Sequence, residues 1–393
     1  MTHYVYAPKD DPKHRERWRE PYDKDELAGF ERFAADGTLS LGFAISPGLS
    51  IDYASGDDRH ALLTKVEQLV ARGVTLVCLA LDDIPFRPRL GEDHASLTTW
   101  LHGKLGERAD LVLVPTEYVG GRPTPYLDAL AAGVPPDVTI AWTGEAVVND
   151  AITGAHARAR AVALGDRPPL LWDNYPVNDA VMADRLFLGP LRGREPALLD
   201  ACVGYLSNPM VQPRASMLPL ASVAAYLRGD DPVAAWRQDA EQLGWTVFAE
   251  ACDGTHPCHL AARAADEGDR SPLVSWLEAA AVCEAPGLEV EAAPWLDQVH
   301  REARLGLRAL RVVAAARDGD VDTVMLELFG VMARWPAVRR AEVAVMGPRC
   351  SFRPVLVQRA DGRWAVDRAA LTEDANAVDA LVRWALDEAA ALA

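Results

Sequence analysis

Short apolar segments alternate with amphipathic segments over the first 210 residues of the chain. The clearest apolar segment, 74–81, is rich in β-branched residues and ends in two adjacent acids, Asp82 and Asp83. A segment that is apolar at every position is typical of a strand buried on both faces, as in a parallel sheet. The preceding segment, 62–70, repeats apolar residues at helical spacing and stops near Gly73. This part of the chain therefore predicts a helix followed by a parallel strand.

The same pattern predicts a series of strands, each ending in polar residues and followed by a helical segment. The strands are expected at residues 4–7, 41–45, 74–81, 111–114, 138–142, 170–172 and 201–206. Their spacing of roughly thirty residues matches about 250 residues shared over eight βα units. We therefore expect an α/β fold, a TIM-type (β/α)8 barrel that lacks its first strand, because no strand pattern precedes Tyr4.

Helical spacing replaces the strand pattern after about residue 210. Apolar residues recur three and four positions apart over 296–310 and 321–331. A last helix is expected over 375–392. The C-terminal part of the chain therefore predicts a helical bundle.

Two β-type runs near the end of the chain flank the turn sequence Ala360-Asp361-Gly362, which predicts a hairpin near 354–367. This hairpin is the expected exception in an otherwise helical part. We expect a catalytic (β/α) barrel domain over 1–212 and a mostly helical C-terminal domain over 213–393.

Composition narrows the classes of partner. The formal net charge of -17 disfavours binding to nucleic acid and to anionic membranes. No apolar run is long enough to span a bilayer, and no signal peptide is visible. The six cysteines lack the spacing of a disulfide framework, which favours free thiols and a cytoplasmic location. The composition does not indicate an oligomeric state.

The polar residues at the expected strand ends indicate the chemistry. Because the carboxyl ends of parallel strands meet at one mouth of a barrel, we expect these side chains to share a site. Carboxylates, amides, a tyrosine and a tryptophan suit a sugar, whose hydroxyls need donors and acceptors and whose ring packs on an aromatic surface. The set has no metal-ligand spacing and no glycine-rich phosphate loop, so we expect neither a metal nor an organic cofactor. The candidates are Lys9, Asp82, Asp83, Tyr118, Trp172, Asn174, Asp179 and Asn208.

The paired acids suggest a particular kind of glycosidase chemistry. Two neighbouring carboxyl groups do not both ionise readily in a partly desolvated site, so one is expected to act as an acid. Adjacent residues do not straddle a sugar ring as the two acids of an ordinary retaining glycosidase do. They suit the substrate-assisted variant, in which the sugar's own 2-acetamido oxygen attacks. Strand alternation sends successive side chains to opposite faces, so this chemistry requires a bend at the strand end.

Each candidate also has an ordinary structural interpretation. The paired acids could be solvated, cap a helix or bind Mg²⁺. The lysine fits a surface charge, the two asparagines fit turns, Asp179 fits a helix cap, and the two aromatic residues fit packing. Elsewhere, Cys252, His256, Cys258 and His259 lie close together but lack the spacing of a structural zinc finger.

Several motifs occur in a defined order over roughly residues 4 to 210. They are Tyr6-Ala7-Pro8-Lys9-Asp10-Asp11, Ala44-Ile45-Ser46-Pro47-Gly48-Leu49, Leu81-Asp82-Asp83-Ile84, Pro115-Thr116-Glu117-Tyr118, Trp142-Thr143-Gly144, Trp172-Asp173-Asn174, Asn178-Asp179, Phe187-Leu188-Gly189-Pro190 and Asn208-Pro209. Together they resemble glycoside hydrolase family 84, the family of O-GlcNAcases and bacterial N-acetyl-β-glucosaminidases. The family opens its barrel with a Glu-Gly-Phe-Tyr-Gly type motif that this sequence does not contain.

The resemblance implies a role for each candidate. Asp82 would orient and polarise the acetamido N–H, and Asp83 would protonate the leaving oxygen and then activate water. Tyr118 would hold the acetamido group, and Trp172 would wall its pocket. The residues implied to bind ring hydroxyls are Lys9, Asn174, Asp179 and Asn208.

The implied function is removal of terminal β-linked N-acetylglucosamine from a glycan or glycoprotein, with retention and without a cofactor. Two alternatives follow from the missing first strand. The chain could be a catalytically inactive GlcNAc-binding module, or an N-terminally truncated fragment of an active enzyme.

Overall fold

The computed structural model describes residues 2–8, 10–347, 356–358, 364–366 and 376–392. The chain divides into two compact units. The first comprises Met1–Asp173, Arg194–Leu206 and Pro354–Arg368, and the second comprises Asn174–Gly193, Ser207–Arg353 and Ala369–Ala393. The predicted boundary after residue 212 falls inside the second unit, and the division into catalytic and helical domains stays a prediction.

A parallel sheet forms the centre of the first unit. Its strands follow one another in chain order, and each neighbouring pair from β1 to β6 is parallel. Within the described residues the strands are β1 (His3–Tyr6), β2 (Ser40–Ile45), β3 (Val74–Ala80), β4 (Asp110–Val114), β5 (Thr139–Trp142), β6 (Leu170–Asp173) and β7 (Gly204–Ser207). This arrangement confirms the predicted α/β fold, a curled sheet with seven of the eight strands of a (β/α)8 barrel in the described part of the chain.

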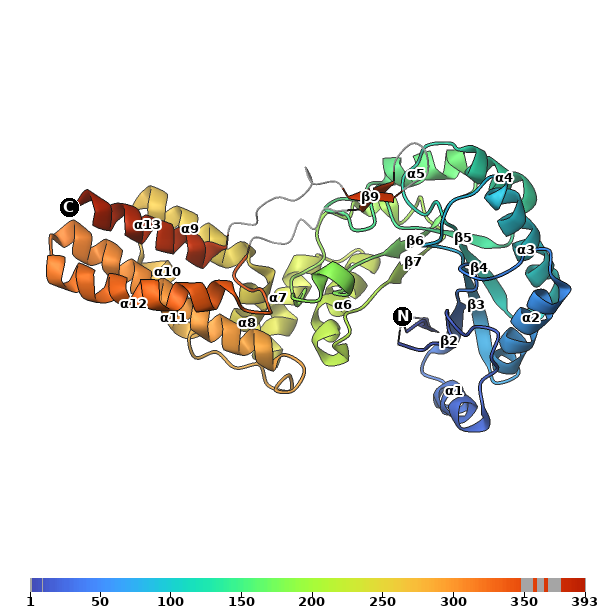
Figure 1. Ribbon diagram of the computed structural model, residues 1–393, viewed down its shortest axis with the longest axis horizontal. Helices are drawn as coiled ribbons and strands as arrows, with labels where there is room; N and C mark the ends of the chain where they lie inside the picture. The colour runs from blue at the N-terminus through green and yellow to red at the C-terminus, as the bar shows by residue number, and fades with distance from the viewer. Residues whose placement is uncertain (1, 9, 348–355, 359–363, 367–375, 393) are drawn as a thin grey trace. The chain divides into compact units, whose positions relative to one another are not determined.

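Helices connect these strands along the chain. They are α1 (Lys24–Asp36), α2 (Gly56–Val70), α3 (Leu90–Leu105), α4 (Pro125–Gly133) and α5 (Gly154–Ala163), with short 3₁₀ turns η1 (Gly106–Arg108) and η3 (Pro196–Leu198). Asp23, Ser55, Thr124 and Thr153 cap the N-termini of α1, α2, α4 and α5 through their side-chain oxygens. Helices α2 to α5 lie along the outer side of the sheet (Figure 1).

The two faces of the sheet carry different residues. Positions such as Phe43, Leu79 and Leu113 pack with the helices in a large apolar cluster. The alternate positions on β2 to β5 are small, and they form a second cluster with Trp172 packed against it. The members of this inner cluster are Ala44, Cys78, Ala80, Val112, Val114 and Ala141. Large residues therefore pack against the helices, and small residues line the inner face of the sheet.

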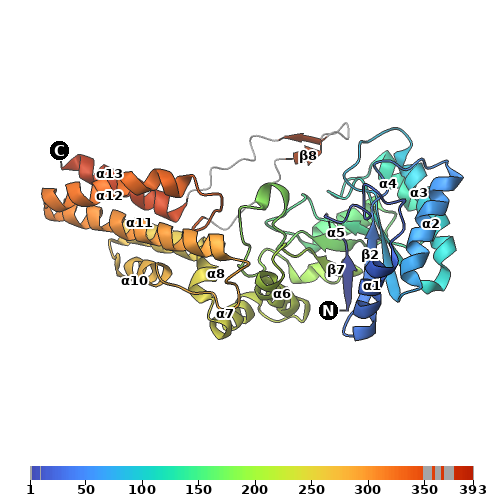
Figure 2. The ribbon, with the colours of Figure 1, turned by 60° about the horizontal axis from the view of Figure 1, so that its bottom comes forward.

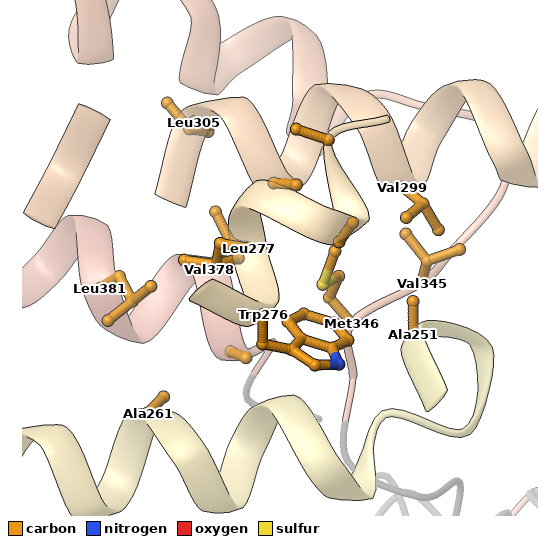
Figure 3. Packing of buried hydrophobic residues seen from close by; sticks show 14 of the residues in the cluster. Ala251, Ala261, Trp276, Leu277, Val299, Leu305, Val345, Met346, Val378 and Leu381 are labelled. Carbon is orange, nitrogen blue, oxygen red and sulfur yellow. The ribbon is translucent and has the colours of Figure 1, made fainter. Parts of the chain in front are cut away.

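The second unit is helical. Its helices are α6 (Pro213–Leu227), α7 (Pro232–Leu243), α8 (Thr246–Asp253), α9 (Thr255–Glu267), α10 (Ser271–Ala280), α11 (Ala293–Asp318), α12 (Val321–Arg339) and α13 (Ala377–Ala391), with the 3₁₀ turn η2 (Ala180–Met182). Helices α11, α12 and α13 run side by side (Figure 2). Trp276 and Leu277 of α10, Val299 of α11 and Leu381 of α13 belong to one apolar cluster (Figure 3). The C-terminal helices predicted from apolar spacing are confirmed.

Strands β8 (Leu356–Gln358) and β9 (Trp364–Val366) pair antiparallel in the region where the hairpin was predicted. In the described residues, no helix is both long and apolar enough to cross a membrane.

Candidate active site

The backbone bends where β3 delivers the paired acids. Leu81 donates its N–H to the carbonyl of Val114 (2.8 Å), which continues the sheet pairing one residue beyond β3. Asp82 is half-buried and lies two positions beyond Ala80, which belongs to the inner face. Asp83 is exposed and has a left-handed backbone with φ 49°. Aspartate is one of the few residues that tolerate this conformation. The expected bend therefore lies at Asp83.

This bend brings Asp83 to Tyr118. The Tyr118 hydroxyl donates to Asp83 Oδ1 (3.0 Å), and Tyr118 is buried. Burial raises the pKa of Tyr118, and the negative charges of Asp83 and Asp82 raise it further. Arg15 donates to the backbone carbonyl of Asp83 (3.1 Å) and fixes the turn from the other side. The structure thus joins two of the predicted site residues by a hydrogen bond and brings the charge of a third, Asp82, to bear on Tyr118.

A buried arginine holds the segment that carries Tyr118. Arg160 of α5 donates to the carbonyls of Glu117 (2.7 Å) and Gly120 (3.3 Å), and the Trp142 indole also donates to Gly120 (3.0 Å). The side chain of Arg160 is fully buried, and burial lowers its pKa to about 10, so it stays charged near neutral pH. The backbone carbonyls take the place of a carboxylate partner around this cation. Sequence reasoning missed Arg160, because it looks like any helix residue.

A buried chain of hydrogen bonds supports the ends of β3 and β4. Tyr53 Oη lies 2.9 Å from His94 Nε2, and His94 Nδ1 lies 2.8 Å from Tyr126 Oη. Thr116 donates its N–H to Tyr126 Oη (2.9 Å) and its hydroxyl to the carbonyl of Leu81 (2.6 Å). Burial lowers the pKa of His94 to about 3, so the imidazole is neutral and joins the two tyrosines without a charge. This chain fixes the backbone one residue before the paired acids.

The loops that follow β1, β2 and β3 are tied together. Ser46 donates its N–H to the carbonyl of His14 (2.9 Å), next to Arg15. A Cβ on Gly48 would lie 3.0 Å from Ile84 Cγ2, so the loop after β2 packs directly on the loop after β3. Burial lowers the pKa of His14 and favours its neutral form. The segment that contains Arg15, whose side chain donates to the carbonyl of Asp83, is therefore held in place by the neighbouring loop.

Trp172 and the residue after it occupy the end of β6. Trp172 is partly buried against the inner cluster of the sheet. Asp173 is fully buried and accepts two hydrogen bonds from Arg194, each 2.7 Å long. The Tyr205 hydroxyl also donates to Asp173. Sequence reasoning did not single out Asp173, although the hydrophobic strand before it was a signal that its charge would need a buried partner.

The second unit contains the other described candidates. Asn208 Nδ2 donates to Asn174 Oδ1 (3.0 Å), so these two predicted residues are adjacent. Asp179 is half-buried and precedes η2, and its side chain does not cap that turn. Asn174 and Asn208 are therefore brought together. The plain helix-cap interpretation of Asp179 does not hold. Their placement beside the paired acids stays a prediction, and Lys9 lies outside the described residues.

The cysteines and histidines near residue 255 lie in the described part of the chain. There, no group of three or more His, Cys, Asp and Glu side chains could hold a metal ion. Cys252 ends up on α8, whereas His256 and Cys258 lie on α9. Metal-assisted chemistry therefore has no candidate ligand set among these residues.

Comparisons with known proteins identify the family of this chain. A family model described as beta-N-acetylglucosaminidase matches residues 1–252. The protein O-GlcNAcases of Rattus norvegicus and Mus musculus are each 31% identical over 248 residues, which cover 58% of this chain and 27% of theirs. The chain thus spans about a quarter of the length of these curated relatives.

Solved structures agree with this match. A mutant of the O-GlcNAc hydrolase of Thermobaculum terrenum superposes with a TM-score of 0.79 at 25% identity, covering 88% of this chain and 85% of that one. A structure titled CpGH84B has a TM-score of 0.75 at 23% identity over 88% of this chain and 69% of its own, and shows the same fold. The resemblance seen in the sequence motifs is confirmed. The chain belongs to the beta-N-acetylglucosaminidase family, glycoside hydrolase family 84.

Proposed function

We propose that this chain hydrolyses terminal β-linked N-acetylglucosamine with retention, by substrate assistance. The observation that carries the proposal is the left-handed turn at Asp83, which lets its carboxylate accept the Tyr118 hydroxyl directly beside Asp82. Adjacent carboxyl groups on one strand end suit a sugar that supplies its own nucleophile. Membership of the family supports the same chemistry.

The proposed reaction has two steps. In the first, the 2-acetamido oxygen attacks the anomeric carbon while the bond to the leaving oxygen breaks and Asp83 gives that oxygen a proton. Asp82 accepts the acetamido N–H, which raises the electron density on the attacking oxygen. Tyr118 holds the acetamido group as it closes to an oxazoline. In the second step, Asp83 takes a proton from water as the water oxygen attacks the anomeric carbon, and the bond from that carbon to the oxazoline oxygen breaks. The two inversions at the anomeric carbon give net retention.

The remaining candidates are proposed to bind the sugar. Trp172 would wall the acetamido pocket, because its partly buried ring packs on the inner face of the sheet. Asn174, Asp179 and Asn208 would bind ring hydroxyls through amide and carboxylate groups. Lys9 is proposed for the same role on its motif alone. The substrate would be a GlcNAc-bearing glycan or glycoprotein, and the cytoplasmic location stays a prediction.

Aryl β-N-acetylglucosaminides with leaving groups of graded acidity test the proposal. We expect Asp83→Asn to slow hydrolysis most for poor leaving groups, by roughly 100-fold or more, because general acid catalysis matters most there. Asp82→Asn should slow every member of the series, because it weakens the attack itself. Exposed Asp57 at the start of α2 provides the matched control, and Asp57→Asn should leave the rates unchanged.

Two outcomes would contradict the proposal. Rates in Asp83→Asn that equal those of the wild type for every leaving group would remove Asp83 from the reaction. A wild-type chain that binds a GlcNAc-derived thiazoline, measured by calorimetry, but turns over no aryl substrate would instead be a GlcNAc-binding module.

A further inference from the structure

A buried ion pair lies at the end of β6, one residue beyond Trp172. Arg194 donates from Nε to Asp173 Oδ2 and from one terminal nitrogen to Oδ1, both at 2.7 Å. The two side chains are 3% and 1% exposed. Removing a charge pair from water is costly, and two parallel bonds fix its geometry more tightly than a single contact would. The Tyr205 hydroxyl also donates to Asp173 Oδ2.

The same arginine reaches the loop after β5. Its other terminal nitrogen donates to the backbone carbonyl of Asn149 (3.0 Å). The Asn149 side chain donates to the carbonyl of Thr143 (2.8 Å), and Thr143 donates its N–H to the carbonyl of Tyr118 (3.0 Å). Each link is a direct hydrogen bond between groups of the first unit. A continuous chain of contacts therefore leads from Arg194 to the backbone of Tyr118.

Two chains of contacts therefore start from the guanidinium group of Arg194. One ends at Asp173, which is joined by a peptide bond to Trp172, and the other ends at Tyr118. Under the proposed function, Trp172 and Tyr118 both contact the acetamido group, whose N–H is accepted by Asp82. Both sets of bonds come from the one planar guanidinium of Arg194, so a shift of that group alters both.

We propose that Arg194 is a positioning residue that sets the spacing between Tyr118 and Trp172, and thereby the size of N-acyl group that the site accepts. The proposal rests on the proposed function for the identity of the acetamido pocket. Lysine cannot replace Arg194, because a single ammonium cannot make the paired bonds to Asp173 and also reach Asn149. Weakening the hydrogen bonds of Arg194 should therefore widen the acetamido pocket before it abolishes binding of the sugar.

Two thiazolines derived from GlcNAc, one with a methyl and one with an ethyl substituent, test the spacing by calorimetry without any need for turnover. The measured quantity is the ratio of their dissociation constants, which does not depend on the fraction of folded protein. In Arg194→Lys we expect the ethyl compound to gain on the methyl compound by about threefold or more, since a single methylene in a fitted pocket is worth about tenfold. The kcat/KM ratio for N-propionyl and N-acetyl aryl substrates should shift in the same direction.

Arg19→Lys is the matched control. Arg19 makes a similar paired contact with Asp58, two bonds of 2.6 Å, and none of its bonds leads toward Tyr118 or Trp172. We expect this variant to lose stability without changing the ratio. Tyr205→Phe is the second test, because it removes one bond to Asp173 and keeps the ion pair, and a smaller shift of the same sign is expected.

A purely structural role for Arg194 predicts a different result. If Arg194→Lys and Tyr205→Phe lower the melting temperature but leave the methyl-to-ethyl ratio at the wild-type value, the proposal is overturned. Failure of the proposed function looks different, because the wild type would then bind both thiazolines without hydrolysing aryl substrates, and the ratio would still decide the role of Arg194. A wild type that binds neither compound would overturn both proposals.

Discussion

At the scale of single residues, the backbone of Asp83 constrains what can replace it. The left-handed φ of 49° costs most side chains about 1–2 kcal/mol, whereas glycine and asparagine adopt it readily. We expect Asp83→Asn, which keeps an oxygen for the Tyr118 hydroxyl, to hold the free energy of unfolding within about 0.5 kcal/mol of the wild type. Asp83→Gly and Asp83→Ala both remove that acceptor, so the alanine variant should be about 1 kcal/mol less stable than the glycine variant through the backbone alone. Urea denaturation measures these differences. An alanine variant as stable as the glycine variant would show that the turn carries no strain.

The residues of the site were only partly predictable from the sequence. Asp82, Asp83 and Tyr118 stood at strand ends, and the structure brings them together. The supporting side chains gave no such signal, because Arg160 and His94 lie inside helices and bond groups far away in the sequence. Arg160 bonds a backbone carbonyl, and His94 bonds a tyrosine hydroxyl. Those contacts depend on the folded arrangement of loops, which residue spacing does not encode.

At the scale of elements, small residues allow α3 and α4 to approach closely. A Cβ on Gly91 of α3 would lie 2.8 Å from the carbonyl oxygen of Tyr126 and 2.9 Å from the Cβ of Ala129. Because backbone cannot move aside as a side chain can, we expect Gly91→Ala to lower the free energy of unfolding by about 1–3 kcal/mol.

Gly103 of the same helix provides the matched control. A Cβ there would meet nothing within 4 Å, so Gly103→Ala should raise the free energy of unfolding by about 0.5–1 kcal/mol through the lower entropy of the unfolded chain. Chemical denaturation of both variants measures the two changes. Changes of the same sign would contradict the packing argument.

The elements themselves were largely predictable. Continuous apolar runs identified the buried strands, and the helix over 62–70 matches α2, which begins earlier at Gly56 behind its Ser55 cap. What the pattern did not reveal is that 174–193 belongs with the second unit. That grouping arises from long-range contacts such as the one between the Trp295 indole and the carbonyl of Asp184 (2.8 Å), which no local periodicity shows.

At the scale of the whole molecule, one buried acid links stability to pH. Glu302 of α11 accepts hydrogen bonds from Gln298 and Asn376, both 2.8 Å long, and burial raises its pKa from 4.5 to about 7. The folded state therefore holds a proton that the unfolded chain releases, so this contribution to stability is present at low pH and is lost as pH rises from about 4.5 to 7.

Glu302→Gln isolates that effect. Relative to the variant, the wild type should lose free energy of unfolding between about pH 5 and pH 7, by at most about 1.4 kcal/mol per pH unit. Urea titrations of both proteins across this range give the difference. A difference that stays constant with pH would show that Glu302 titrates in its ordinary range.

The division of the chain also predicts how fragments behave. Leu186 and Leu188 are buried in the core of the second unit, and the Trp236 indole donates to the carbonyl of Leu188 (2.6 Å). A fragment of residues 1–212 would expose both leucines, at a cost of about 1.5–3 kcal/mol each. We expect it to aggregate or bind a hydrophobic dye, as measured by light scattering and fluorescence, whereas the full chain does not. A monomeric fragment with cooperative unfolding would instead support an independent domain ending at residue 212.

The left-handed turn at Asp83 has a genetic consequence. A single base substitution converts either aspartate codon into a codon for asparagine or glycine, the two residues that accept this backbone as readily. Loss of the proposed proton donor and loss of the fold are therefore separable in one mutational step. Under the proposed function, a duplicated gene of this kind would lie one step from a sugar-binding protein without turnover, and its descendants would carry Asn or Gly after an intact Asp82.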